Sequence, residues 1–489
     1  MTCHSDPGQV ASNVRAFDVL IVMTPQTLLL AIGALIVGLA CSPAKAQTLT
    51  TLDPSVDSAQ NSSPSQSTPR LSLQSATDLL IKNNLSVIAA RYNVDILRAQ
   101  RIAAGLRPSP TVIFSANQFA IPRVFRIPSD AIKTNNENGA ANTSYTVEVD
   151  QLIERGGKRE LRTEQANLSM KAAEAQVQDA LRQQLFQLRQ AFFTAVLARE
   201  NLRVAQENLD HFDRTENLLF VQVKEGYSAG VDLKRVQLQR LQFQRDVATG
   251  GQSYQQAVRD VLNLIGQGDA PSVANSSQLI TLSSISPTGF PQEFIDGNLE
   301  IIPELLWIDD LRRMALANRP DIKAAQLNVE AANAGLKLAE AQRVRDVTVG
   351  GQYSRTGSDN TVGAVVGLPL KIGPRANAAI AQATSTKLQA EAQLQLVRTQ
   401  ALTDVEKAFI TYQVSRDRLR LFTGDALATA NDVRRIEEIA YRDGAKGLLD
   451  YLDAQRTYNQ TLVDYNQARF DFLMSLYQLE FATGSAIVK

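Results

Sequence analysis

The sequence predicts a mainly α-helical chain with a small β part, in which a hairpin of long helices occurs twice. Three observations carry this prediction: a helix-forming composition, an internal repeat, and a pair of strand-like segments at the same point of each repeat. Ala, Leu, Gln, Glu and Arg dominate, as in long helices. Because 50 Lys and Arg balance 50 Asp and Glu, charge gives no indication of a nucleic-acid partner.

The first 46 residues are expected to be a signal peptide. Leu28 to Ala40 is one apolar run, short for a membrane helix and typical of the hydrophobic region of a signal peptide. Ala44-Lys45-Ala46 follows as a cleavage motif. Two alternatives stay open at this point: translation starts at Met1 or at Met23, and Cys41 is either removed with the leader or acylated as in a lipoprotein. Every alternative exports the chain.

Residues 47–70 are rich in Ser, Thr, Gln and Pro and are expected to be a flexible lead-in. Beyond them the chain repeats itself. We expect a first copy over residues 71–266, an equatorial linker over 267–305, a second copy over 306–484 and a short tail over 485–489. Matching positions in the two copies include Asn83 and Asn318, Phe192 and Phe409, and Arg199 and Arg416. The first copy carries an extra loop, roughly Pro122 to Asn142.

Each copy is expected to start with a helix, over Leu73–Leu106 and Ile308–Arg343. Two strands follow in each, because β-branched or aromatic residues alternate with polar or small ones. The four strand-like segments are Thr111–Phe119, Ser144–Leu152, Asp346–Ser354 and Thr361–Leu370.

A very long helix and a shorter returning helix complete each copy. Arg159 to Glu225 contains neither Gly nor Pro, and Arg375 to Asp443 contains only Gly424. Such helices reach roughly 100 Å, which no globular core requires. The returning helices are expected over Val231–Ile265 and Leu448–Thr483. Apolar residues recur at coiled-coil spacing along the first long helix, at Leu185, Leu188, Phe192, Ala195 and Leu202.

Two architectures fit these elements. A structural coiled-coil scaffold accounts for the helices alone, whereas the strand pairs favour a membrane protein. Four strands cannot close a membrane barrel, and open edges would leave unpaired backbone groups in lipid. Three chains would supply twelve strands, so this architecture predicts a trimer with long helices forming an α-helical barrel.

The sequence gives little indication of thiol chemistry, a metal site or a nucleotide-binding site. Cys3 and Cys41 both lie in the leader region, and the two histidines are His4 and His211. His211 lies within a strongly helical run and is expected to be a packed or solvated helix residue. The chain contains no Walker-type phosphate loop. We therefore expect no enzyme, no bound cofactor and no metal site.

The turns between the long and returning helices are written almost alike, as EGYSAGVDLKRVQLQ and DGAKGLLDYLDAQRT. Their glycines are Gly226, Gly230, Gly444 and Gly447, which supply positions where the positive φ of a tight reversal costs little. Asp232 and Asp450 then fall in the first turn of the returning helices. Unpaired N–H groups and the helix dipole favour a carboxylate there, so these two acids need no further function.

Asp453 is not explained by the helix start. It follows Asp450 by three residues, so both face the same side of the helix. In a trimer the pair would place six carboxylates around one axis, and a ring of acid at a constriction favours cations over anions. The sequence thus predicts a selective gate at Asp450 and Asp453.

Three stretches give the chain a family resemblance: LIERGGKRELR, VGLPLKIGPRANAAIAQA, and AYRDGAKGLLDYLDAQRTYNQTLVDYNQARFDFL. Together with the repeat they resemble the TolC family of outer-membrane efflux channels, and the first looks like its cobalt–zinc–cadmium branch. The resemblance implies a homotrimer, with a twelve-stranded barrel in outer-membrane lipid and a helical tunnel across the periplasm. It implies an exit duct of a tripartite pump, passing metal ions or drugs.

The resemblance also implies partners and roles. The partners are a periplasmic adaptor protein, docking on the glycine turns, and an inner-membrane transporter of the proton-driven resistance-nodulation-division type. Asp450 and Asp453 match the family's aspartate rings at the periplasmic entrance. Asp232, Tyr441 and Lys446 match positions that link neighbouring hairpins, although Lys446 stands where the family often has Arg. A lysine loses the bidentate pairing that arginine makes.

Overall fold

The computed structural model describes residues 70–117, 144–267, 290–299, 307–357, 359–369, 375–422 and 426–487. The predicted signal peptide with Cys41, the lead-in up to residue 69, the loop from Pro122 to Asn142 and most of the predicted linker lie outside these residues. The described residues belong to one compact unit, Ser67–Lys489.

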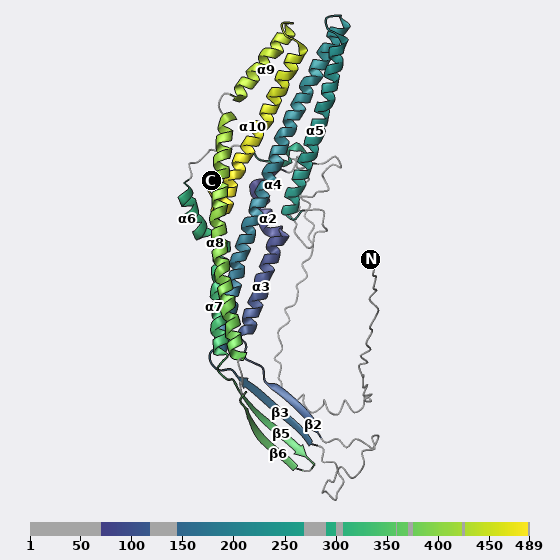
Figure 1. Cartoon of the computed structure of the whole chain (residues 1–489). Helices are drawn as coiled ribbons and strands as arrows, with labels where there is room; N and C mark the ends of the chain where they lie inside the picture. Colours follow the sequence, from purple (N-terminus) through teal and green to yellow (C-terminus); the bar gives the residue numbers. More distant parts are fainter. Residues whose placement is uncertain are drawn as a thin grey trace, which may run out of the picture. The chain divides into compact units, whose positions relative to one another are not determined.

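The predicted fold class is confirmed, because the described chain is mainly helical and the same order of elements occurs twice (Figure 1). The first copy consists of α2 (Leu73–Asn83), α3 (Leu85–Gly105), β2 (Thr111–Asn117), β3 (Ser144–Ile153), α4 (Lys158–Lys224) and α5 (Gly230–Leu264). The second consists of α6 (Ile308–Asn318), α7 (Pro320–Ala341), β5 (Val347–Thr356), β6 (Asp359–Gly367), α8 (Arg375–Leu421), α9 (Leu427–Arg442) and α10 (Leu448–Thr483).

The opening helix of each copy is broken, where we expected one continuous helix. In the first copy Asn84 separates α2 from α3 with an extended backbone, and its side-chain oxygen accepts the N–H groups of Ser86 and Val87. In the second copy Arg319 separates α6 from α7, and Pro320 takes the first position of α7. Proline fits this position because the first N–H groups of a helix have no partner within it.

Each break is held by the end of a returning helix. The Asn84 side chain donates to the carbonyl oxygen of Leu264 at 2.9 Å, and Arg319 donates to that of Ala482 at 3.2 Å. The glycines that follow, Gly266 and Gly484, have φ of 73° and 70°. A Cβ on Gly266 would lie 2.7 Å from the carbonyl oxygen of the residue before Asn84, so no larger residue fits. The repeated closing glycine therefore has a packing reason.

The first long helix is continuous and the second is not. α4 has 67 residues and spans about 100 Å. It packs against α3, α5, α7 and α10, and Figure 1 shows these helices running alongside it. The second long helix was expected to continue from Arg375 to Asp443, but α8 ends at Leu421 and α9 begins at Leu427. Gly424 lies between them, outside the described residues.

The predicted coiled-coil stripe forms the main core. Leu188, Phe192 and Ala195 on α4 are fully buried and Leu202 is 5% exposed. They pack with residues of α5, including Tyr254, in one cluster. Burying each Leu or Phe side chain contributes roughly 1.5–3 kcal/mol. None of the described helices combines the length and the hydrophobicity that crossing a bilayer requires.

Two sheets occur in the described chain. The larger has the order β2-β3-β5-β6 and is antiparallel throughout, so the strands of both copies join edge to edge. The smaller pairs β1 (Leu71–Ser72) with β4 (Ile295–Asp296) in parallel. The Tyr254 hydroxyl donates to the carbonyl oxygen of Pro291 at 2.8 Å, and this bond ties the segment before β4 to α5.

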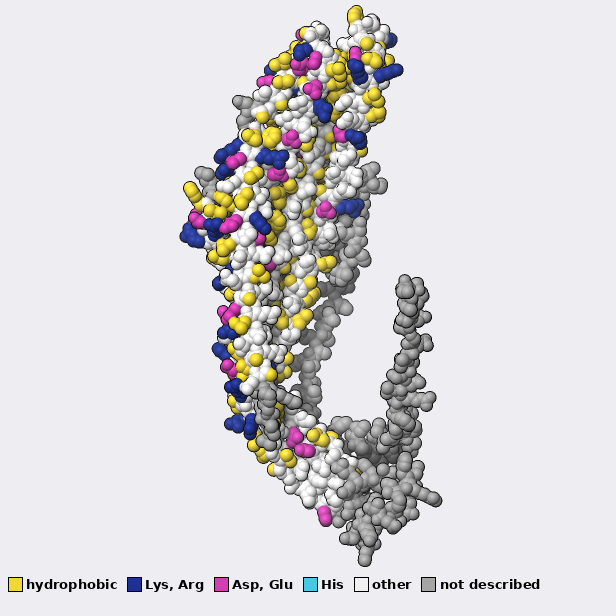
Figure 2. Space-filling view, in the orientation of Figure 1, with side chains coloured by type: hydrophobic (Ala, Val, Ile, Leu, Met, Phe, Trp, Pro, Cys, Tyr) yellow, Lys and Arg dark blue, Asp and Glu magenta, His cyan; other side chains and the backbone are white. Residues whose placement is uncertain are grey.

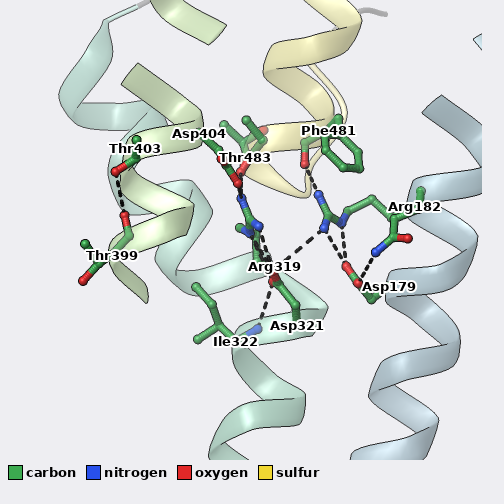
Figure 3. A network of polar contacts seen from close by, with 12 residues as sticks. Asp179, Arg182, Arg319, Asp321, Ile322, Thr399, Thr403, Asp404, Phe481 and Thr483 are labelled. Atoms are coloured by element: carbon green, nitrogen blue, oxygen red, sulfur yellow. Dashed lines mark hydrogen bonds and ion pairs between the residues drawn. The ribbon is translucent and has the colours of Figure 1, made fainter. Parts of the chain in front are cut away.

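A charged network surrounds the break at Arg319 (Figure 3). The Arg319 guanidinium, only 5% exposed, donates to the carboxylates of Asp321 (2.7 Å) and Asp404 (3.1 Å). Since Asp404 lies on α8 and Ala482 on α10, this one side chain connects the break to two further helices. A buried guanidinium is tolerated only when it is paired in this way.

Arg182 of α4 extends the network to the first copy. It pairs with Asp179 at 2.6 Å, lies 3.9 Å from Asp321 and donates to the carbonyl oxygen of Phe481. Burial by itself raises the pKa of Asp321, but the hydrogen bond and charge of Arg319, with Arg182, outweigh it and hold that pKa below its usual value. The network therefore favours the charged form of Asp321 at neutral pH.

Candidate functional site in the hairpin tips and the sheet

The four-stranded sheet has one apolar face and one polar face. Residues opposite each other in the ladder share a face, and the register aligns Val112, Val149, Gly351 and Ala364 in one row. The apolar face carries Val112, Phe114, Ala116, Tyr145, Val147, Val149, Ile153, Val347, Val349, Tyr353, Val362, Ala364 and Val366, interrupted by Gln151, Arg355 and Asn360.

The opposite face is mostly polar. It carries Thr111, Ser115, Ser144, Thr146, Glu148, Asp150, Thr348, Gln352, Ser354, Thr356, Asp359 and Thr361, with Ile113, Leu152 and Val365 as apolar members. Figure 2 shows the sheet from a side that is mostly white, with a few magenta side chains. Within each strand, apolar and polar residues alternate only weakly in the sequence. The register aligns the apolar positions of all four strands, which gives the sheet two distinct faces.

The apolar face is uncovered within the described chain. Phe114 is 76% exposed, Val362 86% and Val149 45%. Soluble monomers rarely expose apolar patches of this extent. β3 and β5 have 10 residues each, the length of a tilted strand that crosses a bilayer. The outer strands β2 and β6 each have one unpaired edge in the described sheet. The apolar face is therefore suited to an apolar environment, and the two unpaired edges are suited to pairing with further strands.

At the other end of α4 lie the two hairpin tips. Gly226 and Gly444, the first glycine of each turn, have φ of 80° and 74°, as predicted. Gly230 begins α5 and Gly447 precedes α10 with φ −80°, so these two glycines do not use the positive φ that glycine allows. A single left-handed residue is enough to reverse the chain, and the second glycine only leads into the returning helix.

The tip acids fall where the sequence placed them. Asp232 lies in the first turn of α5 and pairs with Arg235 at 3.3 Å. Asp450 lies in the first turn of α10, where its carboxylate accepts the backbone N–H of Gly447 at 3.3 Å. Asp453 is exposed and has no side-chain partner in the described part of the chain. Asp453, whose position the start of the helix does not explain, is therefore also the tip carboxylate without a hydrogen bond or ion pair in the described part of the chain.

An apolar and aromatic cluster joins the two tips within the chain. Phe212, Val236 and Phe243 of the first hairpin pack with Leu448 and Tyr451 of the second. Such a contact fixes how the two acidic turns lie relative to each other.

Tyr441, a predicted link residue, belongs to the edge of this cluster. Its ring stacks on Tyr451 with centroids 5.5 Å apart. Burial raises the pKa of Tyr441, and the nearby carboxylate of Asp232 raises it further. Tyr441 and Asp232 are thus close across the hairpins, with no hydrogen bond between them among the described contacts.

His211 is a residue whose role the sequence did not indicate. Its Nε2 lies 3.0 Å from the hydroxyl of Tyr451, which stands on the other hairpin. Burial lowers the pKa of His211, Glu438 opposes this effect, and Arg434 and Arg214 add to it. The neutral imidazole is therefore favoured. The available signal was that His211 is the one histidine of the sequence outside the predicted signal peptide.

Lys446 does not reach the first hairpin in this chain. Its ammonium group lies 3.5 Å from Glu437 of its own hairpin. A link between Lys446 and a neighbouring chain stays a prediction. In the described part of the chain, no group of three or more His, Cys, Asp or Glu side chains is placed to hold a metal ion.

Comparison with known proteins agrees with this geometry. The family model described as outer membrane efflux protein matches residues 76–267 and 311–485. Nodulation protein T of Rhizobium leguminosarum bv. trifolii is 22% identical over 416 residues, covering 83% of this chain and 84% of that protein. The cobalt-zinc-cadmium resistance protein CzcC of Cupriavidus metallidurans is 23% identical over 342 residues, covering 69% and 77%.

Solved structures share the fold. The outer membrane protein VceC of Vibrio cholerae superposes with a TM-score of 0.66 at 18% identity, covering 85% of this chain and 96% of that one. The MtrE outer membrane channel of Neisseria gonorrhoeae, in its open state, gives 0.65 at 19% identity, covering 90% and 98%. Since the family model matches both copies of the repeat, the chain belongs to the outer membrane efflux protein family.

Proposed function

We propose that this protein is the outer-membrane exit duct of a tripartite efflux pump, a passive channel that crosses the periplasm. The uncovered apolar face of a sheet with membrane-length strands carries this proposal. That sheet lies at the start of α4, and the acidic tips lie at its far end, about 100 Å away. A chain built in this way fits a bilayer at one end and a partner protein at the other.

The assembly follows from the unpaired edges. Three copies would join β6 of one chain to β2 of the next and close twelve strands into a ring, which removes every open edge from lipid. The apolar face would meet hydrocarbon and the polar face the water-filled interior. The long helices would continue the ring as a tunnel. Export through the predicted signal peptide would deliver the chain to the periplasm, where the apolar face of the sheet would insert into the outer membrane and leave the tips in the periplasm.

The tips supply the entrance. Asp450 and Asp453 of three chains would form its acidic ring, and Asp232, Tyr441 and Lys446 would link neighbouring hairpins in the closed state. The turns at Gly226, Gly230, Gly444 and Gly447 would receive a periplasmic adaptor protein. An inner-membrane transporter, driven by protons, would supply the energy. We propose metal ions or drugs as cargo. The name of CzcC, for cobalt, zinc and cadmium resistance, supports the metal ions, and a further relative, OpmQ of Pseudomonas putida, is named for pyoverdine export.

Planar-bilayer recording of the purified protein tests the proposal. We expect the protein to extract from the outer-membrane fraction only with detergent and to form conducting channels. A structural periplasmic scaffold without a pore is the alternative. It would appear in the aqueous periplasmic extract and conduct nothing, and either result would rule out the duct.

The gate has its own test. Asp450→Asn with Asp453→Asn removes both charges, while the amide oxygen at position 450 can still accept the N–H of Gly447. We expect lower cation-over-anion selectivity in single-channel recordings, because a ring of carboxylates attracts cations. Asp309→Asn with Asp310→Asn, on exposed acids at the start of α6, is the control. Equal selectivity in all three proteins would contradict an acidic gate at this position.

A further inference from the structure

Three connections between helices and strands carry an exposed arginine without a side-chain partner in the described part of the chain. Arg107 lies between α3 and β2, Arg155 between β3 and α4, and Arg345 between α7 and β5. Other cations nearby are engaged: Lys158 pairs with Asp346, Arg159 with Glu160 and Arg162 with Glu154, at 2.7, 2.7 and 2.8 Å. The three connections therefore present uncompensated positive charge.

These arginines border the apolar face of the sheet. Ile153 and Val347, both on that face, form the last pair of the ladder between β3 and β5. Arg155 lies two residues beyond Ile153, and Arg345 lies two residues before Val347. The backbone N–H of Arg155 donates to the carboxylate of Asp346 at 3.0 Å, which holds the two connections together. Two guanidinium groups thus stand where the apolar surface ends.

Arg107 lines an open pocket at the same end of the sheet. The pocket has a volume of about 540 Å³ and combines the apolar side chains of Pro108, Leu152 and Ile153 with the cations Arg107, Lys158 and Arg159. Its carboxylates, Glu154 and Glu160, are the ones already paired with arginines. A pocket of this composition suits a molecule with an anionic group next to an apolar part.

The surrounding charge favours the same ligand. Figure 2 shows Lys and Arg side chains on the helices next to the sheet, with a few Asp and Glu side chains farther along the same helices. Arg343 and Lys337 on or next to α7 are exposed as well, and Glu340 is an exposed carboxylate among them. The balance of unpaired charge at this border is therefore positive.

We propose that Arg107, Arg155 and Arg345 bind the phosphate groups of anionic phospholipids, where the sheet meets the periplasmic side of the outer membrane. This inference rests on the proposed membrane location. A guanidinium is weakly hydrated and matches phosphate with two parallel hydrogen bonds. Cationic side chains close to an anionic bilayer surface each strengthen binding roughly fivefold at low salt. Because the apolar face begins directly beyond these residues, one lipid could bind the arginines with its headgroup and contact the apolar face with its acyl chains.

The test compares lipid binding by variants of the full-length channel. Native mass spectrometry in detergent, with added phosphatidylglycerol or phosphatidylcholine, counts the lipids retained. The test variants are Arg155→Gln with Arg345→Gln, and the matching pair of Lys substitutions. Arg313→Gln with Arg435→Gln, on exposed arginines of α6 and α9, is the control. Glycerol phosphate added as a competitor separates a lipid site from a site for free phosphate.

We expect wild type to retain phosphatidylglycerol over phosphatidylcholine, and the Gln pair to bind it roughly 25-fold more weakly. The Lys pair should keep most of the binding and the control should match wild type. The proposal is overturned if the Gln pair binds phosphatidylglycerol like wild type, if the control weakens as much, or if glycerol phosphate competes as well as the lipid. Vesicle flotation tests the membrane location separately, and a wild-type protein that fails to float with vesicles would overturn the proposed function together with this inference.

Discussion

Replacing Val149 by arginine tests the two-faced sheet directly. Val149 lies in the middle of β3 on the apolar face, paired with Val112 on one side and Gly351 on the other. Its neighbour Glu148 lies on the polar face. Val149→Arg and Glu148→Arg therefore introduce the same side chain one residue apart on opposite faces.

The expected cost follows from the position in the strand. β3 has 10 residues, so position 149 is near the middle of a bilayer crossing. An arginine facing lipid at this depth costs about 2–4 kcal/mol per chain, and a trimer carries the cost three times. On the polar face the new charge stays in water, and Glu148 shows that this face already carries an acidic side chain. We expect little change in stability from Glu148→Arg.

Heat-modifiable migration of the trimer and its yield in the outer-membrane fraction measure the difference. We expect Val149→Arg to lose trimer at a lower temperature and to reduce the membrane yield, with Glu148→Arg close to wild type. If both variants assemble like wild type, the apolar face does not meet lipid. If both fail equally, the strand tolerates no large side chain and the reasoning from faces is refuted.

Three further predictions concern the helical junctions. Arg319→Leu leaves carboxylates without their buried partner and should lower the free energy of unfolding by about 3–5 kcal/mol. The control Arg313→Leu, on an exposed arginine, should change it by less than about 1 kcal/mol. Equal denaturation midpoints of the two variants would contradict the role of the network. The pKa of Asp321 is lowered on folding, so the stability that its carboxylate contributes is present above the pKa of the unfolded chain and is lost as pH falls through the folded pKa. Asp321→Asn should therefore flatten the acid side of the profile of unfolding free energy against pH. An unchanged slope would contradict this prediction. Gly266→Ala combines positive φ with a backbone clash and should lower the free energy of unfolding by at least about 1–3 kcal/mol. The control Gly251→Ala, whose added Cβ meets open space within α5, should be neutral or stabilising by up to about 1 kcal/mol. An unchanged stability of Gly266→Ala would show that the junction adapts to the larger side chain.

Much of the fold could be predicted from local patterns. Helix-forming stretches without Gly or Pro indicated α4, and alternating residues located all four strands of the larger sheet to within three residues at either end. The first-turn positions of Asp232 and Asp450 followed from glycine turns before helical runs. Pro320 was a local signal for the break between α6 and α7 that the helical pattern outweighed.

Other features depend on partners far apart in the chain. The break at Asn84 needs the carbonyl oxygen of Leu264, and the contact of His211 with Tyr451 joins residues 240 positions apart. Composition could not reveal either pairing.

The sequence by itself determined the duplication, the helical hairpins, the strand segments and the place of the acidic turns, because these depend on periodicity and on residue preferences within a few positions. The tertiary structure alone decided where the helices break, which partner Lys446 takes and how four weakly patterned strands make one apolar face. The physical reason is that ladder register and buried polar contacts couple residues of both copies, and such coupling appears only when the chain is folded.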